Sequence, residues 1–357
     1  MQEEVRSEDR GAETEESGIV EVPPPDSSSF SCTSARSPGV LLIQLGTPDA
    51  PTAQALRPYL RKFLGDPRVI EMPRWLWWPI LQWILLRRPA SSAAKYRRIW
   101  DPVTGSPLLH WTRRQTELLQ QFFPGVPVRF GMQVGNPPVA HVLDEMIKSG
   151  TERLIVLPMY PQYSATTTAS ATDVLFTALQ KQRRVPALRI VPPYYEHPAY
   201  LGAVARRITE ELAKVSGTPD HYVLSFHGIP IKYARRGDPY AVHVKRTTQG
   251  LVKRLGWPRA QWTQSFQSLF GRDRWLKPYT DDVLRNLARK GAKRIFIAMP
   301  GFTADCLETI DEIGHESRSV FLNAGGEYLH VCPCLNDHPV WIEALTAIIR
   351  EEGQGWL

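Results

Sequence analysis

The chain has few cysteines, and we expect no secretory leader. Only four of its 357 residues are cysteine (Cys32, Cys306, Cys332 and Cys334), and their spacing fits neither a disulfide framework nor a zinc knuckle. Cys332 and Cys334 could share a metal ion, but no second pair accompanies them. The N-terminus is acidic and lacks the apolar core of a signal peptide. We therefore expect a reducing, cytoplasmic location and structural cysteines.

Several common functional motifs are also missing. No Gly-x-Gly-x-x-Gly follows the first predicted strand, and there is no Walker loop, Gly-x-Ser-x-Gly elbow or His-Glu-x-x-His motif. Basic residues are scattered, without a Lys/Arg run or a nucleic-acid-binding module, which argues against nucleic acid as a partner. These absences disfavour dinucleotide enzymes, P-loop ATPases, serine hydrolases and zinc proteases.

The charge is unevenly distributed along the chain. Residues 1–37 are acidic, rich in Ser and Pro and poor in large apolar side chains, a composition typical of disorder. The whole chain carries a net charge of +7, so the remainder is distinctly basic. A basic body favours a partner with carboxylate or phosphate groups, either an acidic small molecule or an anionic membrane surface.

One apolar segment, Trp75–Leu86, is rich in tryptophan and flanked by arginines. It is too short to span a bilayer, which needs roughly 20 apolar residues, and Pro79 is expected to interrupt it. A core helix is one interpretation. Three tryptophans among four residues are awkward in a core, because each indole N–H needs a partner. We therefore favour an exposed apolar lip that touches a membrane interface without crossing it.

The chain contains two similar halves. Each has an apolar strand that ends in Gly-x-Pro, then an amphipathic helix, a Gly stop and a second apolar strand running into Pro. The matching segments are Gly39–Pro48 with Tyr222–Pro230, His141–Ser149 with Asp281–Lys290, and Arg153–Pro158 with Arg294–Pro300. Alternating strands and helices predict an α/β fold of two Rossmann-like domains, each a parallel sheet flanked by helices. We place the domains at residues 38–191 and 192–357, with the cleft between them and the last helix (340–352) packing back on the first.

A single histidine stands at the best position for chemistry. The apolar run Tyr222–Phe226 predicts a buried strand that delivers His227 to its carboxyl end, where Gly228 and Pro230 turn the chain. Ligands of open α/β sheets bind beyond the carboxyl ends of the strands. An imidazole there can accept a proton near neutral pH or bind a metal ion.

Three carboxylates follow the corresponding strand later in the chain. Asp305, Glu308 and Glu312 have the spacing of one helical face, starting near Asp305. Asp-x-x-Glu is also an ordinary helix-capping pattern, so capping and chemistry remain equally open for Asp305. Glu308 lies where it can face His227, and such a pair can hold a divalent metal ion or pass protons to solvent.

The motifs together resemble the ferrochelatase family. They are Ser225–Pro230, Arg236-Gly-Asp-Pro-Tyr240, Tyr160-Pro-Gln-Tyr-Ser164, Gln267–Gly271 with Trp275–Thr280, and Asp305-Cys-Leu-Glu-Thr309. The likeness runs from about Gly39 to Arg350. It implies a lyase that inserts Fe²⁺ into protoporphyrin IX in haem synthesis, with two Rossmann-like domains and no dinucleotide.

The resemblance also implies roles for single residues. His227 and Glu308 match the active-site histidine and glutamate, as catalytic residues and metal ligands. Asp305 and Glu312 match further members of an acidic path for protons or metal. The Trp75–Leu86 segment matches the hydrophobic lip, which implies peripheral contact with the inner face of a membrane. Porphyrin-facing positions are expected at Leu45, Tyr96, Arg97, Tyr160, Gln162, Ser164, Ser268 and Trp275.

The sequence departs from the family pattern at a few places. Gln44 replaces the asparagine that many members carry, and residues 100–104 lengthen the turn before Gly105. No Cys-bearing C-terminal extension is present, so no iron–sulfur cluster and no permanently bound cofactor are expected; Fe²⁺ is a substrate. The alternatives are a coproporphyrin ferrochelatase, a sirohydrochlorin-type chelatase, a non-catalytic porphyrin or haem carrier and, least favoured, a metal-dependent hydrolase.

Overall fold

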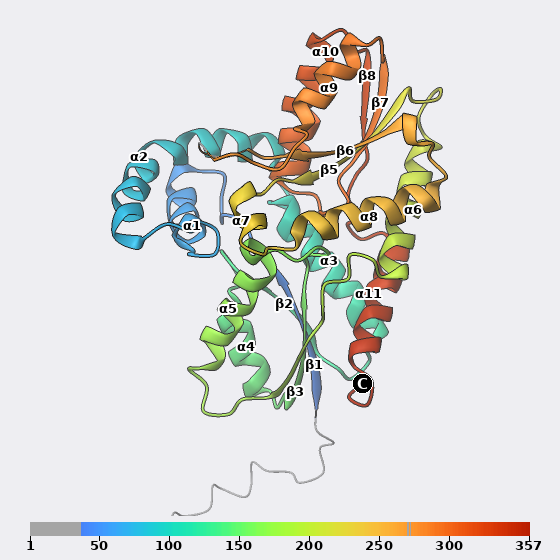
Figure 1. The fold of residues 1–357 in the computed structure, drawn as a ribbon. Helices are drawn as coiled ribbons and strands as arrows, with labels where there is room; N and C mark the ends of the chain where they lie inside the picture. The colour runs from blue at the N-terminus through green and yellow to red at the C-terminus, as the bar shows by residue number, and fades with distance from the viewer. Residues whose placement is uncertain (1–36, 270, 272) are drawn as a thin grey trace, which may run out of the picture. The chain divides into compact units, whose positions relative to one another are not determined.

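The computed structural model describes residues 37–357 except 270 and 272. The predicted tail, apart from Ser37, lies outside this range, and so does Cys32. The described residues contain two four-stranded parallel sheets with helices packed on both faces (Figure 1). This is the predicted α/β class, with one sheet for each half of the sequence.

The first sheet has the strand order β2-β1-β3-β4, and all its pairings are parallel. Its strands are β1 (Pro38–Gln44), β2 (Val128–Met132), β3 (Arg153–Pro158) and β4 (Ala187–Ile190). Its helices are α3 (Pro107–Phe122), α4 (Val139–Lys148), the π-helix η2 (Ala165–Ala169) and α5 (Ser170–Leu179). The predicted strand 153–158 therefore matches β3 residue for residue.

The second sheet repeats this arrangement with the order β6-β5-β7-β8. Its strands are β5 (His221–His227), β6 (Trp262–Gln267), β7 (Arg294–Ala298) and β8 (Tyr328–Val331). Its helical segments are α6 (Pro198–Leu212), α7 (Ile231–Arg235), α8 (Tyr240–Leu255), η3 (Arg259–Gln261), α9 (Thr280–Arg289), the π-helix η4 (Glu308–Ser317) and α10 (Arg318–Asn323). The identical relative strand order confirms the predicted similarity of the halves.

Alternate residues of each central strand face opposite layers, as strand geometry requires. Leu41 and Ile43 of β1 pack against α4 and α5, whereas Val40 and Leu42 join a larger core with α3 and α6. That larger core continues through Leu224 and Phe226 of β5, so one apolar layer serves both sheets.

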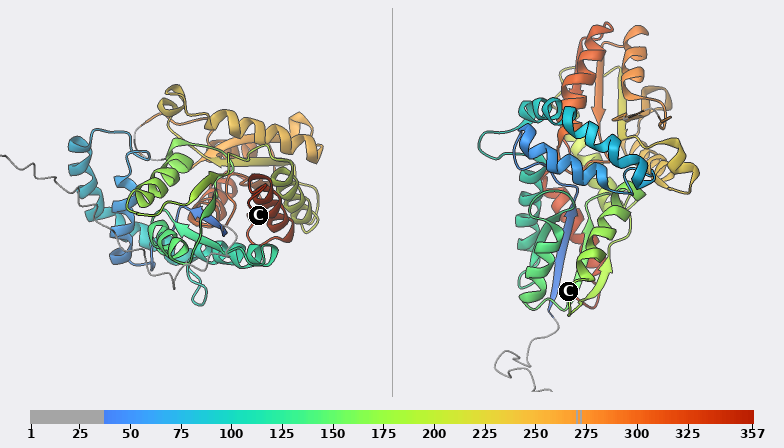
Figure 2. Two further views of the ribbon diagram at one scale, coloured as in Figure 1. Left: turned by 90° about the horizontal axis from the view of Figure 1, so that it is seen from below. Right: turned by 90° about the vertical axis from the view of Figure 1, so that its left-hand side faces the viewer.

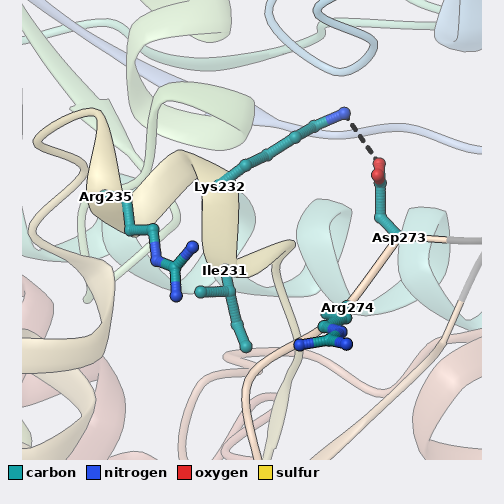
Figure 3. A pocket seen from close by; sticks show the side chains of 5 residues that line it. All are labelled: Ile231, Lys232, Arg235, Asp273 and Arg274. Carbon is teal, nitrogen blue, oxygen red and sulfur yellow. Dashed lines mark ion pairs between the residues drawn. The ribbon is translucent and has the colours of Figure 1, made fainter.

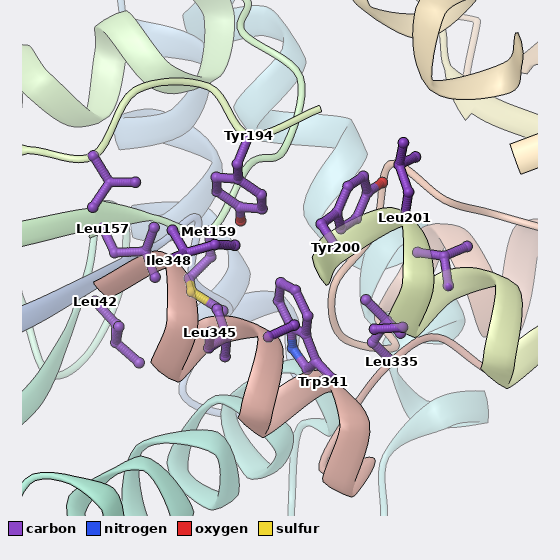
Figure 4. Close-up of a cluster of buried hydrophobic side chains, with 14 of the residues drawn as sticks. Leu42, Leu157, Met159, Tyr194, Tyr200, Leu201, Leu335, Trp341, Leu345 and Ile348 are labelled. Carbon is purple, nitrogen blue, oxygen red and sulfur yellow. The ribbon is translucent and has the colours of Figure 1, made fainter. Parts of the chain in front are cut away.

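The last helix, α11 (Pro339–Glu352), lies between the halves. It packs against α6 and also against α3 and β3 of the first half. Its Trp341 is fully buried beside Tyr194 and Tyr200 (Figure 4). The described residues consequently belong to one compact unit, in which β4 of the first sheet ends at Ile190 and α6 of the second half begins at Pro198.

Two helices project beside the sheets and include the predicted lip. α1 (Ala53–Gly65) and α2 (Arg74–Ile99) pack side by side, as the right panel of Figure 2 shows. The expectation that Pro79 interrupts the apolar segment is wrong. α2 runs through both Pro79 and Pro89 as one helix of 26 residues. Packing of α2 along α1 offsets the backbone hydrogen bonds that the two prolines cannot make.

Candidate active site

The loops that carry the predicted site leave the two topological switch points of the fold. In each sheet the strand order reverses at the first and third strands, β1 and β3 or β5 and β7. Crevices at such reversals bind the ligands of open α/β proteins. The loops after β3 and β7 meet directly, because the Thr303 hydroxyl donates to the Met159 carbonyl at 3.2 Å. Helix α6 also holds the second loop, since Tyr200 Oη donates to the Pro300 carbonyl at 2.6 Å.

His227 is the last residue of β5 and is half-buried. Its Nδ1 lies 2.6 Å from the carbonyl oxygen of Gly228. A carbonyl only accepts, so Nδ1 carries the proton and Nε2 presents a lone pair in the neutral ring. The rings of Trp275 and Phe302 lie 6.4 and 6.5 Å from the imidazole, centroid to centroid. The tautomer is therefore set for Nε2 to accept a proton or bind a metal ion.

Gln267 connects His227 to Glu308. It is the partner of His227 in the β5–β6 register, and its carbonyl accepts the Gly228 N–H at 2.8 Å. Its side-chain Nε2 donates to the Glu308 carbonyl at 2.8 Å, while Oε1 accepts from Ser225. The buried amide thus fixes the first residue of η4 relative to the end of β5.

Glu312 lies one turn beyond Glu308 in η4. Ser268 holds both of its carboxylate oxygens, through its backbone N–H and its hydroxyl, each at 2.5 Å. Burial and, to a lesser degree, the nearby Glu308 carboxylate raise the pKa of Glu312 to about 7, against the lowering effect of the Ser268 hydroxyl. Ser268 itself has φ +66°, a left-handed conformation that is strained for serine.

The structure separates Asp305 from the other two carboxylates. A helix does start near Asp305, at Leu307, but Asp305 itself precedes it, so the expectation that the three carboxylates share one helical face is wrong. The Asp305 carboxylate instead accepts hydrogen bonds from Thr309 Oγ1 at 2.9 Å, Asn336 Nδ2 at 2.7 Å and the Cys334 N–H at 3.3 Å. Its role in this geometry is to fasten the loop after β8 to the start of η4.

Two phenols lie next to Glu308. Tyr59 of α1 and Tyr96 of α2 meet edge to face, with ring centroids 6.4 Å apart. Burial, then the Glu308 carboxylate, raises the pKa of Tyr59; for Tyr96 the order is burial, Tyr59, then Glu308. Tyr59 Oη also donates to the Gly46 carbonyl at 3.4 Å, directly after the predicted porphyrin-facing Leu45. Tyr59 therefore links Leu45, Tyr96 and Glu308, and sequence analysis did not single it out.

The remaining predicted porphyrin-facing residues divide into two groups. Leu45 is half-buried, Trp275 adjoins His227, and Tyr160 donates from Oη to Gln133 Oε1 at 2.9 Å. By contrast, Gln162 is buried and donates to Tyr200 and Thr247. Arg97 is exposed and reaches the Pro51 carbonyl.

Ser164 takes part in hydrogen bonds that join two of the sequence motifs. Its hydroxyl and the Ala165 N–H both donate to Asp238 Oδ2 at 2.8 Å. Tyr240, from the same motif as Asp238, donates from Oη to the His227 carbonyl at 2.9 Å. Gln162, Ser164 and Ser268 are thus engaged in the protein's own hydrogen bonds, two of them across the join between the halves.

Comparison with known proteins agrees with these motifs. The family model described as Ferrochelatase matches residues 37–353. A protein named Ferrochelatase from Pectobacterium atrosepticum is 46% identical over 312 residues, covering 87% of this chain and 97% of its own. Another from an Azoarcus species is 48% identical over 323 residues, covering 89% and 88%. The chain belongs to the ferrochelatase family.

Solved structures of other chelatases share the fold. SirB from Bacillus subtilis, solved with Fe³⁺, superimposes with a TM-score of 0.51 at 15% identity, covering 88% of this chain and 95% of its own. The sirohydrochlorin chelatase SirB from Bacillus subtilis subspecies spizizenii, in complex with cobalt, gives a TM-score of 0.51 at 13% identity, covering 89% and 96%. At these identities the likeness concerns the two-domain fold alone.

Ferrochelatases are lyases that insert a metal ion into a porphyrin, and the described residues offer few metal ligands. Within them no group of three or more His, Cys, Asp or Glu side chains is placed to hold a metal ion. Cys306, Cys332 and Cys334 are buried free thiols whose pKa is raised by burial, which disfavours the thiolate that metals bind.

A basic pocket of about 170 Å³ lies beside the candidate site. It is lined by Ile231, Lys232 and Arg235 of α7 and by Asp273 and Arg274, with Lys232 paired to Asp273 at 2.7 Å (Figure 3). Hydrogen bonds between 229–231 and 274–276 form its wall. Arg274 directly precedes Trp275, whose ring lies 6.4 Å from that of His227, so the pocket adjoins the site through this segment.

The lip presents large apolar side chains to solvent. Trp75 and Leu86 are 79% and 74% exposed, and Trp78 and Trp83 are more than half exposed. Trp77 alone of the first three tryptophans is buried, and its indole N–H donates to the Leu64 carbonyl at 2.7 Å. A cavity of about 510 Å³ opens between Gly65, Arg74 and the tryptophans. No helix in the described part of the chain has the length and apolarity to cross a bilayer.

Proposed function

We propose that this ferrochelatase inserts Fe²⁺ into protoporphyrin IX, with His227 as proton acceptor and His227 and Glu308 as the iron-side ligands. The family supports the reaction class. The observation that supports the residue assignment is the Gln267 link, which joins the end of β5 to the start of η4. The link holds the backbone of Glu308 beside the end of the strand that carries His227.

The reaction must remove two pyrrole protons, and the residues offer two acceptors. The His227 Nε2 lone pair can take one proton, since Nδ1–H is committed to the Gly228 carbonyl. Glu312, with a pKa of about 7, changes protonation near neutral pH and adjoins Glu308. We propose a route for protons from His227 through Glu308 to Glu312. Asp305 enters this route as a support for the start of η4.

Iron transfer needs ligands that let the metal ion go. A closed set of three or four protein ligands would retain Fe²⁺. An imidazole and a carboxylate suit a divalent first-row ion while leaving positions for the porphyrin nitrogens. We propose that no resident cofactor and no iron–sulfur cluster take part, in keeping with the buried, protonated state favoured for the described cysteines.

The porphyrin is proposed to bind between Leu45, Tyr96, Tyr160 and Trp275, with the lip covering one edge. Bending the ring toward the metal costs strain of roughly 1–5 kcal/mol, which must come from binding its remaining surface. Apolar and aromatic side chains favour the less charged protoporphyrin, which has two propionates where coproporphyrin has four.

The lip is proposed to rest on the inner face of a membrane, with the body in the cytoplasm. Exposed tryptophans beside Arg74, Arg87 and Arg88 are typical of an interfacial surface, and Arg87 stacks on Trp83 at 4.7 Å. An apolar porphyrin would pass directly between the membrane and the site.

Porphyrin metallation followed by absorbance under anaerobic conditions tests the proposal. Wild type, His227→Ala and Glu308→Gln would each receive Fe²⁺ or Zn²⁺ with protoporphyrin IX or coproporphyrin III. We expect turnover of protoporphyrin that collapses in both variants while porphyrin fluorescence quenching shows retained binding. Preferred turnover of coproporphyrin would reassign the substrate, and tight binding without turnover would leave a porphyrin carrier.

A further inference from the structure

The last turns of α2 are ion-paired to the π-helix η4. Arg98 Nε and Nη2 donate to the two oxygens of Asp311 at 2.6 and 2.8 Å. Lys95 Nζ lies 2.6 Å from Glu316 Oε1, and Arg98 Nη2 lies 3.4 Å from the same oxygen. Two cations on one face of α2 therefore meet two carboxylates of η4.

The Arg98–Asp311 pair differs from an ordinary surface ion pair. The Asp311 side chain is only 1% exposed, whereas that of Arg98 is 47% exposed. A buried carboxylate depends strongly on its cation, and a two-pronged guanidinium contact fixes orientation as well as distance. The pair therefore restrains how η4 is rotated about its axis.

Asp311 lies between the two carboxylates that the proposed function uses. Glu308 precedes it by one turn and Glu312 is the next residue. In a π-helix each hydrogen bond spans one residue more than in an α-helix, so a change of winding would turn Glu312 relative to Glu308. A restraint at Asp311 acts on both side chains at once.

Apolar contacts hold the same two elements together on either side of Glu308. Tyr96 and Ile99 of α2 belong to a cluster with Leu307 and Ile310. Leu307 and Ile310 bracket Glu308 in the sequence. Thus α2 touches η4 through aromatic and aliphatic contacts next to Glu308 and through Arg98 one turn further on.

We propose that Arg98 is a positioning residue: its grip on Asp311 sets the rotation of η4 that directs Glu308 and Glu312 toward the His227 site. This inference rests on the proposed function. π-Helices are rare and are found mainly as short segments, which makes an external restraint on a ten-residue example informative. Because Arg98 ends the helix that begins with the lip, the same pair ties the lip to the metal-handling segment.

If the Arg98–Asp311 ion pair served stability alone, its removal would not change activity. Replacement of both residues therefore separates a role in stability from a role in positioning η4. Arg98→Met leaves the Asp311 carboxylate buried without its cation and should lower the melting temperature. The double variant Arg98→Met/Asp311→Leu removes both charges and should recover most of that loss. Arg98→Lys keeps the positive charge but lacks the planar guanidinium that contacts both Asp311 oxygens. Its activity should lie between that of wild type and that of the double variant.

The deciding measurement is Zn²⁺ insertion into protoporphyrin at a temperature where every variant is folded. We expect the double variant to show a kcat at least tenfold below wild type or a KM for Zn²⁺ at least tenfold above it, with unchanged porphyrin affinity. A double variant with wild-type kcat and KM would overturn the proposal. The matched pair Arg285→Met/Asp282→Leu, which removes a 2.7 Å ion pair within α9, should leave both constants unchanged.

A second readout distinguishes failure of this inference from failure of the proposed function. Co²⁺ titration of the porphyrin-free protein, followed by its visible absorption, needs no turnover. We expect weaker Co²⁺ binding in the double variant than in wild type, and equal binding would contradict the positioning role. Absence of porphyrin metallation by the wild type would instead overturn the proposed function.

Discussion

Ser268 donates both its backbone N–H and its hydroxyl to Glu312, one to each carboxylate oxygen at 2.5 Å. Ser268 adopts φ +66° in making this contact, and β6 ends one residue earlier at Gln267. Two consecutive residues therefore hold two members of the proposed proton route, since Gln267 holds the backbone of Glu308 and Ser268 holds the carboxylate of Glu312. The strained backbone at Ser268 is explained by this double contact.

Glu312→Gln should stabilise the protein at alkaline pH. The pKa of Glu312 is raised from 4.5 to about 7, so its ionisation costs the folded state free energy as pH rises between these values. At about 1.4 kcal/mol per pKa unit the full cost is roughly 3–4 kcal/mol. Urea unfolding should show a small difference between the variant and wild type at pH 5 and most of this gain at pH 8.5.

The exposed Glu343 supplies a control for this pH dependence. Glu343→Gln changes a carboxylate on the solvent side of α11 and should give the same difference from wild type at both pH values. A Glu312→Gln gain that is equally large at pH 5 and 8.5 would show that the carboxylate is not protonated in the folded protein near neutrality.

Asp305→Ala should lower stability more than it lowers turnover. The substitution leaves the Cys334 N–H, Asn336 Nδ2 and Thr309 hydroxyl without their charged acceptor, at a cost of about 2–4 kcal/mol. Thermal unfolding measures the loss, and Zn²⁺ insertion at 15–20 °C, about the temperature of greatest stability for many domains, measures activity. A fully stable Asp305→Ala protein with the activity of Glu308→Gln would return Asp305 to the proton route.

The fold was predictable because its local signals agree. Apolar runs that end in Gly-x-Pro, together with glycine stops after amphipathic helices, located β1, β3, β5 and β7 within two residues at either end. These strands are buried on both faces, and strands in that environment have nearly continuous apolar sequences. The equivalence of the two halves followed from the same pattern.

The site was only partly predictable, because sequence spacing does not specify which way a polar group turns. Asp305 fits a helical face by spacing, yet its carboxylate binds residues 334–336, which are distant in sequence. Gln162 and Ser164 lie in the right motif but serve buried contacts with Tyr200 and Asp238. Tyr59 carried no signal beyond one aromatic residue in an amphipathic helix, since its role depends on α1, α2 and η4 meeting in space.

Gly46→Ala should prevent formation of the turn that presents Leu45. Gly46 has φ +103°, and an added Cβ would lie 1.7 Å from the Val134 carbonyl oxygen, so the backbone itself would have to move. We expect loss of soluble folded protein, or a melting temperature far below wild type with no metallation. Gly125→Ala provides the comparison, because Gly125 has φ +79° but open space around the added carbon.

The comparison isolates steric overlap from backbone strain. An alanine in the left-handed region costs roughly 1–2 kcal/mol by itself, and Gly125→Ala should show only that loss. Equal destabilisation by the two substitutions would mean that the close approach of the β1 and β2 loops at Gly46 is not required for the fold.

Trp75→Ser/Trp78→Ser should weaken binding to lipid vesicles without affecting the fold. Both side chains lie mainly in solvent, so their removal leaves the core unchanged. Transfer of this much apolar surface into a membrane interface is worth roughly 2–3 kcal/mol per tryptophan. Co-sedimentation with anionic vesicles should therefore fall at least tenfold. Val242→Ser, which removes an exposed apolar side chain from α8, should bind as wild type does. Unchanged sedimentation of the tryptophan variant would mean that the lip serves porphyrin entry alone. The same variant should therefore also be assayed for metallation of protoporphyrin, supplied once in detergent and once in vesicles.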